Sequence, residues 1–237
     1  MTRAGAGRLS QIVLALHAAV LASLHGAFAL RQGPVAIDSP GLYSAIGPPC
    51  EPANTWHACL PALTVAPDLR TAGALTLTVA LLTAFAALRR SRRTTPAALG
   101  VASATLLLVG GGFVPALTAA LAATASAPSR ARRNALASPF REDSRVAPSR
   151  ARREAPATRV ALGGRGRADG SSAAVLARAW PWALGAFLAW ALGGWWLGAV
   201  ANDALVRLGG ATFLLDIALP VAVVVTARAR VALGSPR

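Results

Sequence analysis

Three ionisable side chains interrupt apolar stretches of this sequence and could carry chemistry inside a membrane. Asp216 stands between Phe213 and Pro220, and His17 and His25 stand in the first apolar stretch. A carboxylate at bilayer depth costs about 2.5–3.5 kcal/mol on insertion scales, and such residues mark ion pathways and proton relays. His17 could be the partner of Asp216, whereas His25 lies about 12 Å further along a helix. We expect either a proton or cation relay or a protonated Asp216 that hydrogen-bonds to a neighbouring helix.

A glycine run followed by a proline divides another apolar stretch. Gly110, Gly111 and Gly112 each cost about 1 kcal/mol relative to alanine in a helix interior, and Pro115 clashes with a preceding helical turn. The halves on either side, 96–109 and 116–125, are each too short to span a membrane. The stretch 96–125 is therefore either a kinked span or a re-entrant segment that enters the membrane and returns.

The two cysteines, Cys50 and Cys59, lie in a polar stretch between apolar ones. We expect them to form a structural disulfide outside the cell, where disulfides persist. The alternative is a redox pair in a membrane thiol enzyme, although the spacing is not that of a CxxC motif. The spacing also fits no zinc pattern, even with His57 included.

Sequence motifs for catalysis are absent. The chain contains no phosphate-binding loop, nucleophile elbow, zinc-protease motif or dinucleotide-binding loop. We therefore assign no catalytic residue, no metal ligand and no cofactor, and we expect a protein that is not an enzyme.

The elements that carry these residues are apolar helices. Of the 237 residues, 54% are hydrophobic and 14% are charged, whereas soluble domains carry about 25% charged residues. A spanning helix needs about 20 mostly apolar residues. We predict an all-α integral membrane helical bundle with four or five transmembrane helices, at 11–30, 71–88, 96–125, 180–200 and 208–227.

The first apolar stretch has a second interpretation. Basic residues precede it and Ala27-Phe28-Ala29 resembles a cleavage site, so residues 1–29 could be a signal peptide. The apolar run is long for a signal peptide, which favours an uncleaved anchor. Both interpretations place the loop 32–70 outside.

The chain divides into three parts by composition. Residues 1–125 form an N-terminal set of membrane segments, and residues 179–237 form a C-terminal membrane hairpin. Between them, 126–178 contains twelve arginines and four acidic residues, with Ala-Pro-Ser-Arg-Ala-Arg-Arg at both 127–133 and 147–153. We predict that this Arg-rich loop is disordered. Either this loop is a solvated tether without a ligand or it contacts anionic lipid. Nucleic acid is disfavoured because stacking aromatics are missing.

Arginine placement predicts the orientation, because basic residues accumulate in cytoplasmic loops. The formal net charge is +15, and every basic residue is arginine. With a re-entrant third segment and four spans, all arginine clusters lie on the side of the N-terminus. We therefore expect a multi-pass protein of the cell membrane with a cytoplasmic N-terminus, although the length of 96–125 still favours five spans.

The stretch 180–200 carries five of the six tryptophans and a set of small residues. Trp180 and Trp182 at one end, and Trp195 and Trp196 at the other, predict aromatic belts at the two membrane interfaces. The four-residue spacing of Gly185, Ala189 and Gly193 permits close approach of another helix. We expect a helix-packing membrane partner or a homo-oligomer there, unless the spacing arises by chance in an Ala/Gly-rich chain.

These features support three functional hypotheses. The Trp180-Pro-Trp and Gly-Gly-Gly-Phe-Val-Pro patterns resemble those of small prokaryotic integral membrane proteins and imply no activity. The leading hypothesis is a non-enzymatic scaffold or accessory membrane subunit. The second is a small ion, proton or solute transporter or channel that uses the Gly110–Pro115 break and Asp216. The third is the thiol redox enzyme.

Overall fold

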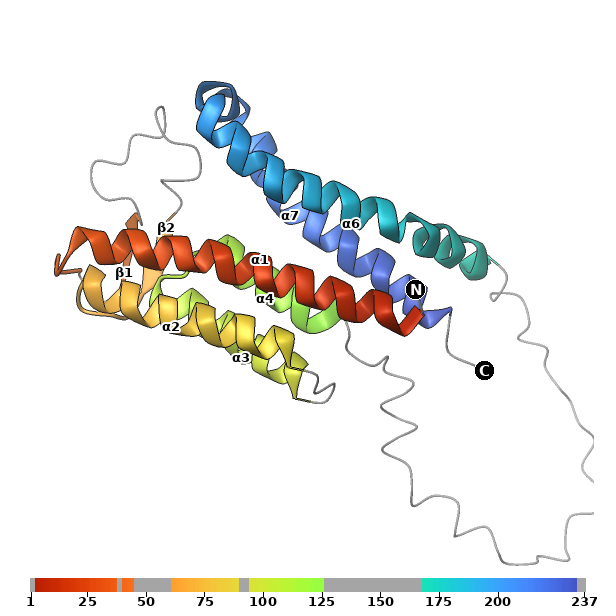
Figure 1. The fold of residues 1–237 in the computed structure, drawn as a ribbon, viewed down its shortest axis with the longest axis horizontal. Coiled ribbons are helices and arrows are strands. Elements are labelled where there is room, and N and C mark those ends of the chain that lie inside the picture. Colours follow the sequence, from red (N-terminus) through yellow and green to blue (C-terminus); the bar gives the residue numbers. More distant parts are fainter. Residues whose placement is uncertain (1–2, 38–39, 45–60, 90–93, 126–167, 234–237) are drawn as a thin grey trace, which may run out of the picture.

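The computed structural model describes residues 3–37, 40–44, 61–89, 94–125 and 168–233. Its helices are α1 (Arg3–Gln32), α2 (Leu69–Leu88), α3 (Thr95–Val109), α4 (Phe113–Ala125), α6 (Ala168–Val200) and α7 (Asn202–Ala232) (Figure 1). Within these described ranges, four helices are long and apolar enough to cross a membrane: α1, α2, α6 and α7. The prediction of an all-α membrane bundle is confirmed.

Helices α1 and α2 cross at unusually short range. A Cβ atom added to Gly73 would lie 2.6 Å from the carbonyl oxygen of Gly26, and one added to Gly26 would lie 2.9 Å from the carbonyl oxygen of Gly73. Only glycine at both positions lets the two backbones approach so closely, which is how membrane helices gain van der Waals contact. Small residues continue the contact along the two helices, with Ala18, Ala22 and Ala80 buried between them and α3–α4.

The third apolar stretch is a helical hairpin rather than one continuous span. α3 has 15 residues and α4 has 13, so each is about 20 Å long and shorter than a bilayer core of about 30 Å. The two helices pack against each other, and the hydroxyl of Ser103 donates to the carbonyl oxygen of Ala116 at 2.7 Å. This leaves four long helices where the sequence also allowed five.

A short β-hairpin lies between α1 and α2, where the sequence analysis predicted only a polar loop. Strands β1 (Gly41–Ser44) and β2 (Pro61–Thr64) pair antiparallel, with Gly41 opposite Thr64. The end of β2 reaches the α3–α4 turn, because the Val65 N–H donates to the Leu108 carbonyl at 2.9 Å. The hairpin was missed because its strands are short and neither Gly41–Ser44 nor Pro61–Thr64 alternates between apolar and polar residues.

Side chains cap both ends of α2. At the N-terminus, Oδ1 of Asp68 accepts the backbone N–H of Thr71 at 2.8 Å. The hydrogen bonds from the Thr71 backbone and hydroxyl hold the pKa of Asp68 below its ordinary value. At the C-terminus, the Arg8 guanidinium of α1 donates to the carbonyl oxygens of Ala87 and Arg89. A cation on terminal carbonyls is favourable because it opposes the negative end of the helix dipole.

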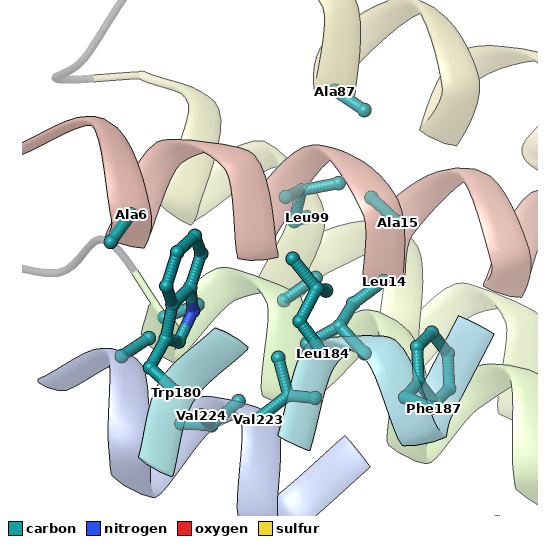
Figure 2. Close-up of a cluster of buried hydrophobic side chains, with 13 residues drawn as sticks. Ala6, Leu14, Ala15, Ala87, Leu99, Trp180, Leu184, Phe187, Val223 and Val224 are labelled. Atoms are coloured by element: carbon teal, nitrogen blue, oxygen red, sulfur yellow. The ribbon is translucent and has the colours of Figure 1, made fainter. Parts of the chain in front are cut away.

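Helices α6 and α7 form an arm that joins the α1–α4 body at one end only. The core cluster between arm and body takes Trp180, Leu184 and Phe187 from α6, and Val223, Val224 and Ala227 from α7 (Figure 2). These residues come from the middle of α6 and from the second half of α7. The connection between α6 and α7 lies away from the body, so the arm diverges from α1 (Figure 1).

Helix α6 begins earlier than expected. It starts at Ala168, so residues 168–178 are helical although the sequence analysis assigned them to the disordered Arg-rich loop. Strong helix formers such as Ala173, Ala174 and Leu176 continue the helix ahead of its apolar part. The rest of that loop, 126–167, lies outside the described residues.

Replacing Gly73 with alanine should destabilise the bundle by about 1–3 kcal/mol, the usual cost of overpacking, because the added methyl group meets backbone rather than a flexible side chain. The measurement is thermal or denaturant unfolding of the protein in detergent micelles.

The matched control is Gly100→Ala on α3, where an added Cβ meets nothing within 4 Å. It should leave stability unchanged or raise it by about 0.5–1 kcal/mol, because alanine is favoured over glycine in a helix. Equal stability of the two variants would mean that the Gly26–Gly73 crossing does not govern packing.

Candidate functional site

Asp216 lies in α7 and takes a hydrogen bond from the neighbouring helix. The indole N–H of Trp190, on α6, donates to Oδ1 of Asp216 at 2.8 Å. The second carboxylate oxygen, Oδ2, is buried. α7 remains one helix through this region even though Pro220 lies inside it. The carboxylate is therefore fixed within the arm by a donor from α6.

His17 brings α1 to the same place. Its ring meets the ring of Phe187 edge to face, with the centroids 5.1 Å apart, and Phe187 lies one turn before Trp190 on α6. Three helices thus contribute to one group, which we name the His17–Trp190–Asp216 cluster.

His25 belongs to a different part of the bundle, as its position eight residues after His17 suggested. Its Nδ1 lies 3.0 Å from the carbonyl oxygen of Leu21 in the same helix. On its other side, a Cβ added to Gly112 would lie 3.1 Å from Nε2 of His25. The imidazole of α1 therefore packs directly on the glycine turn between α3 and α4.

The glycine turn is held by hydrogen bonds from several elements. Gly110 and Gly112 have φ angles of 97° and 83°, a left-handed conformation that glycine adopts without steric cost. The Gly111 N–H donates to the Leu106 carbonyl at 2.8 Å, and the Thr76 hydroxyl of α2 donates to the Val109 carbonyl at 2.8 Å. Thr76 lies seven residues into α2, so the turn sits about 10 Å along that helix.

Pro115 has a different role from the one that the sequence suggested. It is the third residue of α4, where a backbone N–H has no partner within the helix. The proline is therefore accommodated at the start of a helix rather than breaking one. The glycines, and not the proline, end α3.

The sequence analysis missed Trp190 as the donor to Asp216, and it did not foresee that Trp180 packs inside the bundle. Trp180 is buried, its N–H donates to the Ser10 hydroxyl at 2.9 Å, and Arg230 lies over its ring. The pairing of Trp190 with Asp216 could have been inferred from their positions in the sequence. Trp190 and Asp216 lie at similar distances from the α6–α7 connection at Ala201, so an antiparallel hairpin places them near each other.

Two further predictions were a disulfide and the absence of a metal site. Cys50 and Cys59 lie outside the described residues, so both the disulfide and the redox hypothesis stay predictions. In the described part of the chain, no group of three or more His, Cys, Asp or Glu side chains could hold a metal ion.

The His17–Trp190–Asp216 cluster combines a carboxylate, a fixed hydrogen-bond donor and a titratable ring inside an apolar bundle. Such a group can hold a proton or a small cation, or it can simply join helices by hydrogen bonding. No family model matches this chain, and no curated protein and no solved structure is detectably similar to it.

Proposed function

We propose that this multi-pass helical membrane protein is a non-enzymatic scaffold or accessory subunit that binds a transmembrane helix of another membrane protein along α6. The single observation that carries the proposal is the open face of α6. A Cβ added to Gly185 or Gly193 meets nothing within 4 Å, so another helix backbone could approach as closely as α1 approaches α2.

The two faces of α6 differ in what they contact. Trp180, Leu184 and Phe187 recur at helical spacing and are buried against α1 and α7. The opposite face carries Gly185 and Ala189, which are exposed, between large exposed side chains. Those side chains include Trp182, Leu192 and Trp196, which are 81%, 73% and 69% exposed. Small residues flanked by large ones are typical of helix-packing surfaces in membranes.

The position of the open face supports the same proposal. It lies opposite the side of α6 that packs on α1 and α7, so a partner helix could reach it without displacing a part of the described bundle.

A photo-reactive amino acid at position 189 should crosslink to another membrane protein in native membranes, because this position lies at the centre of the open α6 face. Crosslinked products are identified by mass spectrometry. The Gly185→Leu/Gly193→Leu double variant should weaken the crosslink severalfold by keeping the partner helix away.

The control position is Leu81 on α2, which is 69% exposed and has the large exposed side chains of Leu82 and Phe85 beside it. Lipid adducts alone at both positions would contradict the proposal. A crosslink to a second copy of this chain would show that α6 binds another copy of the protein instead of a different membrane protein.

We further propose that the N-terminus, the Arg-rich loop and the C-terminus face the cytoplasm. Arg8, Arg89, Arg228 and Arg230 support this orientation, because they lie at the helix ends that share one side of the bundle. The same side would place the Arg-rich loop near anionic lipid headgroups, where each basic residue contributes about 1 kcal/mol. The loop 32–70 would then lie outside.

A reporter fused at Arg150 should give a cytoplasmic signal, because two spans, α1 and α2, followed by a re-entrant α3–α4 hairpin leave the chain on the side of its N-terminus. A fusion in the α6–α7 connection, at Asp203, is the control and should give the opposite signal. Equal signals at the two positions would contradict the proposed orientation.

A second candidate function is a small transporter or channel for a proton, ion or solute. The observation that favours it is the His17–Trp190–Asp216 cluster, since ionisable groups within membrane helices usually mark transport pathways. The glycine turn against His25 adds a second feature, because non-helical backbone at membrane depth is common where transporters bind their substrates.

Asp216→Asn should abolish proton or sodium flux into proteoliposomes while the protein still accumulates in the membrane, because asparagine keeps the hydrogen bond from Trp190 but loses the charge. Flux is followed with a pH-sensitive dye or with radioactive sodium. Asp203→Asn, at the start of α7, is the matched control and should leave flux unchanged. Full flux through the Asp216→Asn variant would contradict this candidate.

A further inference from the structure

We propose that the junction between the α1–α4 body and the arm binds the phosphate group of an anionic phospholipid, with Arg230 of α7 at the centre of the site. The start of α1 and the end of α7 lie together at this end of the bundle (Figure 1). The site needs neither a partner helix on α6 nor transport through the bundle, so it goes beyond both candidate functions.

Contacts between three helices hold Arg230 in place. Its guanidinium carbon lies 4.9 Å from the centroid of the Trp180 ring on α6. That ring is fixed in turn, because Trp180 is buried and its indole N–H donates to the Ser10 hydroxyl of α1 at 2.9 Å. A cation–π contact uses none of the five N–H donors of a guanidinium. Arg230 is therefore a positioned cation that can still donate to an anion.

Other arginines lie at the same end of the bundle. Arg228 is exposed two positions before Arg230, and Arg178 is exposed two positions before Trp180. On α1, the Arg8 guanidinium donates to the carbonyl oxygens at the C-terminus of α2. Three helices thus bring positive charge to this end, and an anion that approaches Arg230 is attracted by all of them.

The acidic residues of the described helices lie away from Arg230. These helices contain three, Asp169, Asp203 and Asp216. Asp169 lies eleven positions before Trp180, about 16 Å along α6, and Asp216 lies fourteen positions before Arg230, about 21 Å along α7. Asp203 lies at the opposite end of α7. Both distances exceed the Debye length of about 8 Å at physiological ionic strength, so these acids do not neutralise Arg230.

The arginines lie inside the apolar spans rather than beyond them. The spans run over Ser171–Gly194 in α6 and Ala211–Ala232 in α7. Arg178 lies seven positions inside the first and Arg230 two positions inside the second, which correspond to about 10 Å and 3 Å. A charged side chain at this depth extends toward the membrane surface and needs a partner of opposite charge. Lipid phosphate groups are the anions of that layer.

Exposed apolar side chains flank the cations on both helices of the arm. Val175 and Leu176 on α6 are 66% and 40% exposed, and Val225 and Leu233 on α7 are 45% and 42% exposed. A ligand that matches both features has an anionic head and hydrocarbon chains, whereas a free phosphate ion would use the cations alone. Arginine binds phosphate through paired hydrogen bonds, and basic sites between membrane helices bind anionic lipid headgroups.

The proposal is tested by native mass spectrometry of the full chain released from detergent micelles. Phosphatidylglycerol and phosphatidylcholine with identical acyl chains are supplied in equal amounts, and the bound copies of each are counted. The wild-type protein should retain phosphatidylglycerol in preference, because the choline headgroup carries a positive charge that the arginines repel.

Arg230→Gln should lower this preference about fivefold, which corresponds to about 1 kcal/mol, the contribution of one basic residue near an anionic lipid surface. The matched control is Arg207→Gln, the same change at the opposite end of α7 with Asp203 four positions before it, and it should leave the preference unchanged. Because Arg178 is exposed, Arg178→Gln leaves the packing intact. It should lower the preference about twofold even where Arg230→Gln unfolds the protein.

The outcomes separate the site from general charge attraction and from free phosphate. Equal retention of the two lipids by the wild-type protein, or equal losses in Arg230→Gln and Arg207→Gln, would overturn the site. Excess inorganic phosphate should leave the bound phosphatidylglycerol in place. Displacement of the lipid by inorganic phosphate would replace the phospholipid by a free phosphate ion.

Discussion

The close crossing of α1 and α2 at Gly26 and Gly73 is the contact on which the rest of the bundle depends. α1 packs against α2, α4 and α7, so the position of α1 decides what each of them meets. Lipid tails are as apolar as the helices, so membrane helices gain little from hydrophobic burial and depend on short-range packing. Glycine at the crossing and alanine on either side allow this short-range packing. Three separate contacts then follow from the one helix: Ser10 meets Trp180, His17 reaches the arm, and His25 reaches the glycine turn.

The second constraint is that the backbone N–H and carbonyl groups need hydrogen-bond partners where α3 ends. Irregular backbone at membrane depth requires partners from the protein, because no water is present to supply them. The turn obtains them from three elements. Thr76 of α2 bonds the Val109 carbonyl, Val65 after β2 bonds the Leu108 carbonyl, and Gly111 bonds back to Leu106. The β-hairpin is therefore part of the membrane bundle rather than an independent loop, since it closes the end of the α3–α4 hairpin.

The arm combines an apolar exterior with one polar group. Its attachment to the body is concentrated near Trp180, where the indole packs in the core, donates to Ser10 and lies under Arg230. Toward the α6–α7 connection the arm leaves α1 (Figure 1). The ring of Phe187 on α6 contacts the ring of His17 on α1, and the open α6 face lies on the other side of the same helix. The two candidate functions therefore use different faces of one helix.

The sequence by itself determined the helices and the residue types, because apolar length and glycine content act locally. It located the four long helices and the interruption at Gly110–Gly112, and it singled out Asp216 within an apolar stretch. Only the tertiary structure decided which faces meet. Gly185 and Gly193 have the spacing of a packing motif yet face outward, whereas Gly26 and Gly73, each in a row of small residues, form the actual crossing. Likewise the contacts of Trp180 in the core and the hydrogen bond from Trp190 to Asp216 appear only once the helices are packed. Spacing defines a helix face, but the partner of that face depends on the arrangement of all the helices, which no local pattern encodes.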